Sequence, residues 1–296
     1  MQPTPRYQSD KLKERKRRLR KFKIAGSVIL FVLLLGSVTY VTHLPGLRVE
    51  QIIVSDLSYT DRSAVELTIK EQLDGRYLGL FSKANSFIFP RRAIKRRILS
   101  LYPAIHNVNI DFRGRHTIAV RLTEHTPVAV WCDIPVTPAV ILEHVDEAGD
   151  VTASLPQIPE DRTGSNCFFL NEQSVIFAQL KGSVPEGMVT FYGKIIKDPL
   201  RQTYAPYKEF TDLLDFTRLV RRLEIVITEV WTTGGEAYTF VTQSGTQLHI
   251  DSEDNLVEVF ANLQTVIDRD AINKAQFGNI KYIDLRFGNR VFYKLR

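Results

Sequence analysis

An uninterrupted run of 18 uncharged residues, Ile24 to Val41, constrains the fold of this chain more than any other feature. A helix rises about 1.5 Å per residue, so this run would be about 27 Å long, close to the thickness of a bilayer's hydrocarbon core. The preceding residues 1–23 carry ten Lys and Arg residues and two acidic ones. By the positive-inside rule such a tail stays in the cytoplasm. The sequence therefore predicts a basic cytoplasmic tail over 1–23, a transmembrane helix over 24–43 and an exported remainder.

A cleavable signal peptide and a buried helix of a soluble domain are the alternatives to a membrane anchor. A signal peptide has an apolar core of about 7–15 residues and small residues at its cleavage site. This run is longer, and the bulky Tyr40 and His43 stand where small residues would be needed. A buried helix would need a neighbour to pack against, and no adjacent segment has helical periodicity. We therefore expect an uncleaved anchor.

The basic character of the chain is concentrated in the tail. The whole chain has 39 Lys and Arg residues and 33 acidic residues, but residues 24–296 alone carry 29 basic and 31 acidic ones. A protein that binds nucleic acid needs a basic face on its folded domain. The charge therefore indicates membrane topology, with a secondary attraction to anionic lipid headgroups. Nucleic acid is not an expected partner.

The sequence shows no recognisable constellation for catalysis or for binding a metal or cofactor. The six histidines form no His-x-x-x-His pair and have no spacing that joins them to the cysteines. Glycine-rich phosphate loops and a Gly-x-Ser-x-Gly elbow do not occur. The acidic residues Asp251, Glu253 and Asp254 precede a predicted helix, where capping and the helix dipole account for them. We therefore expect a protein that is not an enzyme and has no cofactor.

Residues 48–124 have the pattern of a small module of strands and helices. Asp61 is a typical N-cap before apolar residues at helical spacing, and Pro90 is typical of a helix start. The later strands alternate between polar and apolar residues around a Gly-containing turn. The predicted order is β-α-α-β-β, with a strand at Arg48–Val54, helices beginning near Asp61 and Pro90, and strands at Ile105–Phe112 and Thr117–Thr123.

The second helix of this module carries a cluster of five basic residues between Arg91 and Arg97. Its apolar residues share another face, so the cluster is expected to be exposed. A solvated helix face is the ordinary explanation. The alternative is a contact face for an acidic partner or for membrane headgroups. That candidate contact face consists of Arg91, Arg92, Lys95 and Arg96.

Residues 125–296 are rich in short strands and contain two predicted helices, Lys208–Arg222 and Asn255–Ile267. The dipeptides Gly234-Gly235 and Ser244-Gly245 lie between strands, where hairpins need positive φ. The chain closes with two strands, the last of them Arg290–Leu295. The predicted fold class is α+β: an N-terminal transmembrane helix, the β-α-α-β-β module, and a mostly antiparallel β domain with two helices.

A Pro-containing excursion interrupts the β domain between its only two cysteines. Residues 133–166 have little periodicity, and a connection of this length is unusual inside a compact domain. Cys132 and Cys167 flank it. Export permits a disulfide, which would clamp the base of the excursion, whereas two free buried thiols are the alternative. We expect the disulfide.

Four segments of the chain follow one another in an order that resembles a known family. They are Val49–Val54, Arg97–Val108 with Pro103 inside it, Val120–Ala129, and Tyr282–Val291 with the sequence Tyr-Ile-Asp-Leu-Arg-Phe-Gly-Asn-Arg-Val. Behind a single N-terminal anchor, they are similar to segments of the FtsQ/DivIB family of bacterial cell-division proteins. The resemblance covers about residues 20–296. It implies that residues 48–124 are a POTRA module and that 125–296 are the family's β domain.

The same resemblance implies a non-enzymatic scaffold of the division machinery, in the cell (inner) membrane at the septum. It implies binding to FtsB-like and FtsL-like bitopic proteins and an indirect effect on the FtsW/FtsI septal peptidoglycan synthase. A partner segment would add to the edge of the last strand. Phe287 matches a family position where an aromatic residue contributes to binding, with core packing as the alternative. The partner-binding residues implied are Arg286, Phe287, Asn289, Arg290, Val291, Phe292 and Tyr293.

A second class of function is a POTRA-bearing component that chaperones or transports polypeptides in the cell envelope. Proteins of that class carry a transmembrane β-barrel after the module, and this chain has too few strands with an apolar band for one. The excursion 133–166 departs from the FtsQ/DivIB pattern, which has a short turn there. Contacts at that side of the β domain are therefore not transferred from the family.

Overall fold

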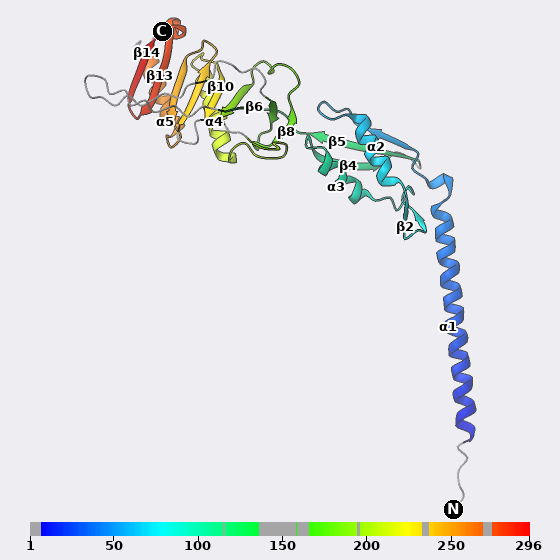
Figure 1. The fold of residues 1–296 in the computed structure, drawn as a ribbon. Helices are drawn as coiled ribbons and strands as arrows, with labels where there is room; N and C mark the ends of the chain where they lie inside the picture. Colours follow the sequence, from blue (N-terminus) through cyan, green and yellow to red (C-terminus); the bar gives the residue numbers. More distant parts are fainter. Residues whose placement is uncertain are drawn as a thin grey trace, which may run out of the picture. The chain divides into compact units, whose positions relative to one another are not determined.

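Helix α1 (Tyr7–Thr42) runs through both the basic tail and the uncharged run without a break (Figure 1, blue). The computed structural model describes residues 7–114, 116–135, 158, 166–193, 196–232, 237–268 and 274–296. Within α1, Glu14–Thr42 is long and apolar enough to cross a membrane, and its apolar window is not buried in the protein. The predicted boundary at residue 23 is therefore no boundary in secondary structure, because the basic residues continue the same helix.

Internal contacts divide the chain into two units, Met1–Glu124 and His125–Arg296, which are described separately. Beyond α1, unit 1 contains a three-stranded sheet in the order β1-β5-β4, with β1 parallel and β4 antiparallel to β5. Asp61 caps the first helix of this sheet module as predicted, because its Oδ1 accepts the Ser63 N–H at 2.9 Å. The elements are η1 (Pro45–Leu47), β1 (Gln51–Val54), α2 (Arg62–Leu73), α3 (Arg91–Leu101), β4 (Ile105–Phe112) and β5 (Thr117–Glu124).

The helices α2 and α3 pack on the sheet through one apolar core. Val65 and Ile69 of α2 and Ile94 and Ile98 of α3 are all fully buried. They recur at spacings of three or four residues, so they share one face of each helix. The basic residues of α3 lie on the remaining, exposed faces.

A short hairpin between α2 and α3 was not predicted from the sequence. It consists of β2 (Arg76–Tyr77) and β3 (Phe81–Ser82), which pair antiparallel. Strands of two residues are too short to show the alternation on which strand prediction depends. The turn between them contains Gly79 with a φ of +73°, a region that glycine favours.

Unit 2 is built around a nine-stranded sheet in the order β14-β13-β12-β11-β10-β9-β6-β7-β8. Five neighbouring pairs are antiparallel, and the pairs β6–β9, β9–β10 and β12–β13 are parallel. A mostly antiparallel sheet with few helices is thus confirmed. The strands are β6 (Ala129–Pro135), β7 (Cys167–Leu170), β8 (Ile176–Gln179), β9 (Val189–Gly193), β10 (Ile227–Thr232), β11 (Ala237–Thr242), β12 (Gln247–Asp251), β13 (Ile280–Phe287) and β14 (Arg290–Leu295).

The helices of unit 2 are connections between parallel strands. Helix α4 (Tyr207–Arg221) follows β9 and precedes β10, whereas α5 (Leu256–Asp268) and η2 (Lys274–Asn279) connect β12 to β13. Parallel neighbours need a crossover of this length, because a tight turn joins only antiparallel strands. The main core holds buried residues of α4 and α5 together with Trp131, Phe191, Val230, Phe240, Leu248 and Ile283 of the sheet.

The strand register defines a second row of side chains, on the sheet face opposite this core. The paired positions are Tyr192–Trp231, Trp231–Thr239, Thr239–His249, His249–Asp284 and Asp284–Phe292. The row is buried from Tyr192 to Asp284 and becomes exposed at Phe292, where it reaches the last strand. Polar groups in its buried part therefore need partners within the sheet.

Cys132 and Cys167 form a disulfide that joins β6 to β7. They face each other across the two strands, and beside them the backbone N–H of Asp133 donates to the Asn166 carbonyl oxygen at 3.1 Å. Asn166 in turn donates its N–H to the Asp133 carboxylate at 2.6 Å. The base of the predicted excursion is thus closed by a covalent bond and hydrogen bonds. Residues 136–157 and 159–165 of the excursion lie outside the described residues.

Candidate partner-binding edge

The last strand, β14, is one of the two edges of the unit 2 sheet (Figure 1, red). It pairs with β13 on its inner side through a hairpin in which Gly288 has a φ of +62°. Hairpin turns of two residues require positive φ, which a Gly-Asn sequence supplies. Among the described strands, none pairs with the outer side of β14.

The other edge strand, β8, is covered at its start by residues 201–204. Ile176 donates its N–H to the Gln202 carbonyl at 2.9 Å and accepts from the Arg201 N–H at 2.7 Å. The Tyr204 N–H donates to the Ser174 carbonyl at 2.9 Å. Cover by a loop is a common protection of edge strands. The two edges therefore differ, since the start of β8 is covered and no described strand pairs with the outer side of β14.

Arg296 shows which backbone groups of β14 point outward. Its N–H donates at 2.9 Å to the carbonyl of Asn279, directly before β13. Backbone groups alternate in direction along a strand. The N–H groups of Val291, Tyr293 and Leu295 therefore point away from β13, to the outer side of the edge.

Aromatic side chains gather at the open edge. Phe287, Phe292 and Tyr293 are each about half exposed, at 48%, 51% and 49%. The rings of Phe287 and Phe292 meet edge to face, with their centroids 5.2 Å apart. Half-exposed aromatic rings on an open edge are typical of a contact surface rather than of a core.

A buried ion pair supports this aromatic group. Asp284 is buried in β13, and its carboxylate accepts two hydrogen bonds from the Arg286 guanidinium, at 2.9 and 2.6 Å. These bonds raise the pKa of Arg286, so it stays charged. The guanidinium also lies 5.7 Å from the centroid of the Phe287 ring. Arg286 thus connects the buried row to the exposed aromatic edge.

His249 lies next to Asp284 in the same buried row. Its Nδ1 is 3.0 Å from the Thr239 hydroxyl, and its Nε2 is buried with no hydrogen-bond partner among the described residues. Burial lowers the pKa of His249 to about 4, an effect opposed by Asp284 and reinforced by Arg286. The imidazole is therefore neutral at pH 7.

The structure brings together the residues implied for partner binding, in one hairpin. Phe287 is exposed, so the alternative of core packing does not hold for it. Val291 differs, because it is partly buried against the main core. The remaining implied residues are Arg286, which is partly buried, and Asn289, Arg290, Phe292 and Tyr293, which are exposed.

The candidate contact face on α3 belongs to unit 1 and is separate from this edge. Arg92, Lys95 and Arg96 are exposed. Arg91 is also exposed, but its guanidinium stacks against Phe89 and Phe112, at 5.0 and 4.9 Å from the ring centroids. Arg91 therefore has a packing role within unit 1.

The residues implied for partner binding did not include Asp284 and His249, which lie behind the edge, or Leu295, although Leu295 belongs to the predicted last strand. Leu295 is 59% exposed at the end of β14. The Asp-Leu-Arg sequence in β13 was a signal for Asp284, because residues 284 and 286 lie on one face of a strand. No local signal places His249 beside them, because that position depends on the β12–β13 register.

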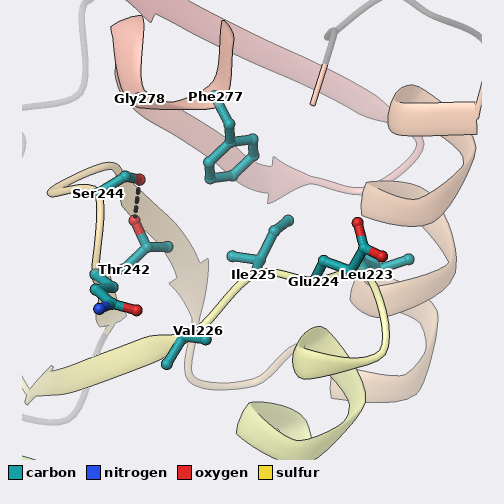
Figure 2. Close-up of a pocket in the computed structure, with 9 residues that line it drawn as sticks. Leu223, Glu224, Ile225, Val226, Thr242, Ser244, Phe277 and Gly278 are labelled. Carbon is teal, nitrogen blue, oxygen red and sulfur yellow. Dashed lines mark hydrogen bonds between the residues drawn. The ribbon is translucent and has the colours of Figure 1, made fainter. Parts of the chain in front are cut away.

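A cleft of about 400 Å³ lies between residues 223–226, which connect α4 to β10, the β11–β12 turn and η2 (Figure 2). Ile225 and Phe277 point toward one another across it. The hydroxyls of Thr242 and Ser244 hydrogen-bond to each other at 2.9 Å. Its lining residues include no His, Cys or Asp that could pair with these hydroxyls in catalysis. In the described part of the chain, no group of three or more His, Cys, Asp and Glu residues could hold a metal ion.

No protein-family model and no curated protein matches this chain. The resemblance to the FtsQ/DivIB family therefore depends on the four sequence segments alone. The open edge of β14 is the feature of the described structure that bears most directly on function.

Proposed function

We propose that this protein is a non-enzymatic, single-pass membrane scaffold of the bacterial division machinery, of the FtsQ/DivIB type. In this proposal α1 anchors it in the cell membrane at the septum, with the basic tail in the cytoplasm. Unit 1 acts as the POTRA module. Unit 2 binds FtsB-like and FtsL-like bitopic proteins, and through them affects the FtsW/FtsI synthase.

The fold of unit 1 supports the POTRA assignment. Its sheet order β1-β5-β4 and the two helices on one core agree with a β-α-α-β-β module. The hairpin β2–β3 is an addition between the helices. The apolar length of α1 supports the anchor.

The open edge of β14 carries the proposal. A partner segment that adds as a tenth strand would form backbone hydrogen bonds with the outward groups of Val291, Tyr293 and Leu295. The exposed rings of Phe287 and Phe292 would contact its side chains. Backbone pairing supplies affinity and the aromatic contacts supply selectivity.

A matched pair of substitutions at Tyr293 tests strand addition. Tyr293→Ala removes the side chain and keeps the outward N–H, whereas Tyr293→Pro removes both. Proline is tolerated on an edge strand where the missing N–H faces outward. We expect Tyr293→Pro to weaken binding of the FtsB-like partner about tenfold more than Tyr293→Ala does, as measured by titration with the purified full-length proteins.

Thermal unfolding of both variants provides the control for folding. Equal affinities for two folded variants would contradict strand addition. A photo-crosslinking residue in living cells identifies the partner: at position 292 it should capture the FtsB-like protein, and at Gln179 on β8, the other edge strand, it should not. Capture at both positions, or at neither, would also contradict the proposal.

A further inference from the structure

The segment between α2 and α3 exposes large apolar side chains. We define the hairpin segment as residues 76–89, which contains β2 and β3. Leu78 is 91% exposed and Phe87 is 78% exposed, and Leu80 and Ile88 are exposed as well. Connecting segments are normally polar, so several large apolar side chains on one of them mark a contact surface.

Hydrogen bonds fix the hairpin segment to the end of α1. The Asn85 side-chain amide donates to the Thr42 carbonyl, the last residue of α1, at 3.3 Å. The Ser86 N–H donates to the Leu47 carbonyl at 2.8 Å. Asn85 and Ser86 are both buried, and β3 lies within contact distance of α1. The hairpin segment is therefore held at the point where the chain leaves its membrane-spanning helix.

The composition of the hairpin segment fits a membrane interface. Arg76 and Lys83 provide positive charge, and Tyr77 provides an amphipathic ring, with the Lys83 ammonium 5.9 Å from its centroid. Basic residues contact phosphate groups, and aromatic residues are enriched at headgroup level.

The turn of the hairpin segment retains a leucine where the backbone favours other residues. Leu78 has a φ of +50°, a region in which Asn, Asp or Gly are favoured. A polar turn residue would suit both the backbone and water. A leucine at this position is favoured over Asn, Asp or Gly only where its side chain is transferred from water into an apolar environment.

We propose that the hairpin segment lies in the headgroup region of the phospholipid leaflet at the C-terminal end of α1. Leu78 and Phe87 would reach the acyl boundary, while Arg76 and Lys83 contact phosphate. The inference depends on the proposed function in one respect, the membrane insertion of α1. Lipid is the occupant rather than a protein, because attachment to the end of α1 brings this surface to the bilayer in every copy.

Spin labels on the full chain in lipid nanodiscs test this placement. The native cysteines form a disulfide, so a thiol-reactive label attaches to an introduced cysteine. Three variants are compared: Leu78→Cys in the hairpin segment, Leu33→Cys in α1, and Ser58→Cys at an exposed position beyond β1. The nanodiscs contain phosphatidylcholine and phosphatidylglycerol, and no partner protein is present. We expect labels at 78 and 33 to collide several-fold more with oxygen than with a water-soluble nickel chelate, and the label at 58 to show the reverse.

The outcomes separate this inference from the proposed function. The inference would be overturned if the label at 78 were as accessible to the nickel chelate as the label at 58. If the label at 33 were still protected in that case, the membrane anchor would stand. Accessibility at 33 would overturn the anchor as well. Protection at 78 that arises only when a partner protein is added would identify a protein-binding surface and overturn the lipid contact.

A second pair of variants tests whether the apolar side chains of the hairpin segment cause the protection of the label at 78. Phe87→Glu places charge in the hairpin segment, and Leu67→Glu places it on an exposed apolar position of α2. Phe87→Glu should reduce the protection of the label at 78 several-fold, and Leu67→Glu should leave it unchanged. Equal effects of the two variants would contradict a specific lipid contact.

Discussion

At the scale of single residues, the exposed aromatic side chains at β14 are supported by a buried ion pair. Asp284 binds Arg286 in the buried row, and Arg286 stacks against Phe287 at the surface. The ion pair fixes the guanidinium, so the aromatic ring has a defined neighbour. The resemblance to a family motif drew attention to Phe287 and Arg286, which lie together in the last hairpin, and their role in binding stays a prediction. The position of His249 was not predictable, because it requires the parallel register of β12 and β13.

His249 makes the stability of unit 2 depend on pH. Burial lowers its pKa from the ordinary 6.5 to about 4, so the unfolded chain takes up a proton at a higher pH than the folded chain. Its contribution is therefore fully present above about pH 7 and is lost as the pH falls from 6.5 toward 4. The pKa difference corresponds to about 3 kcal/mol. We expect the free energy of unfolding, measured in urea, to fall by that order across this range.

The variant His249→Gln isolates this effect. It removes the titrating group, so the decrease between pH 6.5 and 4 should become shallower by about 3 kcal/mol. An unchanged pH profile would show that other groups dominate it. Near pH 8, where the histidine is neutral in both states, the profile of each protein should be flat.

At the scale of secondary-structure elements, those with a long periodic pattern of apolar residues were predicted more accurately than short ones. Helices with several apolar positions, such as α2 and α5, and the long strands β4 and β5 were predicted within a few residues. The edge position of β14 was also expected and is confirmed by the strand order, in which no described strand pairs with its outer side. The hairpin β2–β3 and the short helix η2 were missed, because a few residues carry no periodicity. The three parallel pairings were missed as well, since long-range pairing depends on partners that local patterns do not identify.

The disulfide between β6 and β7 should stabilise unit 2 without affecting the edge. The cysteines are 35 residues apart, and a loop of this size gives about 3–4 kcal/mol in the chain-entropy model. We expect the double variant Cys132→Ser, Cys167→Ser to lose stability by that order in urea unfolding. Binding at β14 should be unchanged at temperatures where the variant is folded, because five strands lie between β14 and β6.

The reduced wild-type protein is the matched control for this variant. It should unfold at the same urea concentration as the double variant, since both lack only the covalent link. If the oxidised protein were no more stable than the reduced protein and the double variant, the disulfide would not contribute to stability.

At the scale of the whole molecule, the anchor and the binding edge act together in the proposed scaffold. Partners that are themselves anchored share a thin layer at the membrane surface. Such confinement raises their effective concentration, so a modest contact at β14 is sufficient. In this view the sequence of α1 matters less than its ability to span the membrane.

Replacement of the anchor tests this view. An unrelated transmembrane helix in place of residues 24–42 should preserve association with a membrane-anchored partner, whereas deletion of the anchor should weaken it about a hundredfold. Energy transfer between labelled proteins in vesicles measures both. Loss of association after replacement alone would show that α1 itself contacts the partner.

The covered side of β8 has a further consequence, for the size of the complexes this protein forms. A sheet with two open edges takes part in open-ended growth, in which each added copy offers a new edge to the next. Here residues 201–204 bond to the start of β8, whereas no described strand pairs with the outer side of β14. If strand addition in the proposed scaffold occurs at β14 alone, the protein would terminate a sheet rather than extend it, and its complexes would have a fixed stoichiometry.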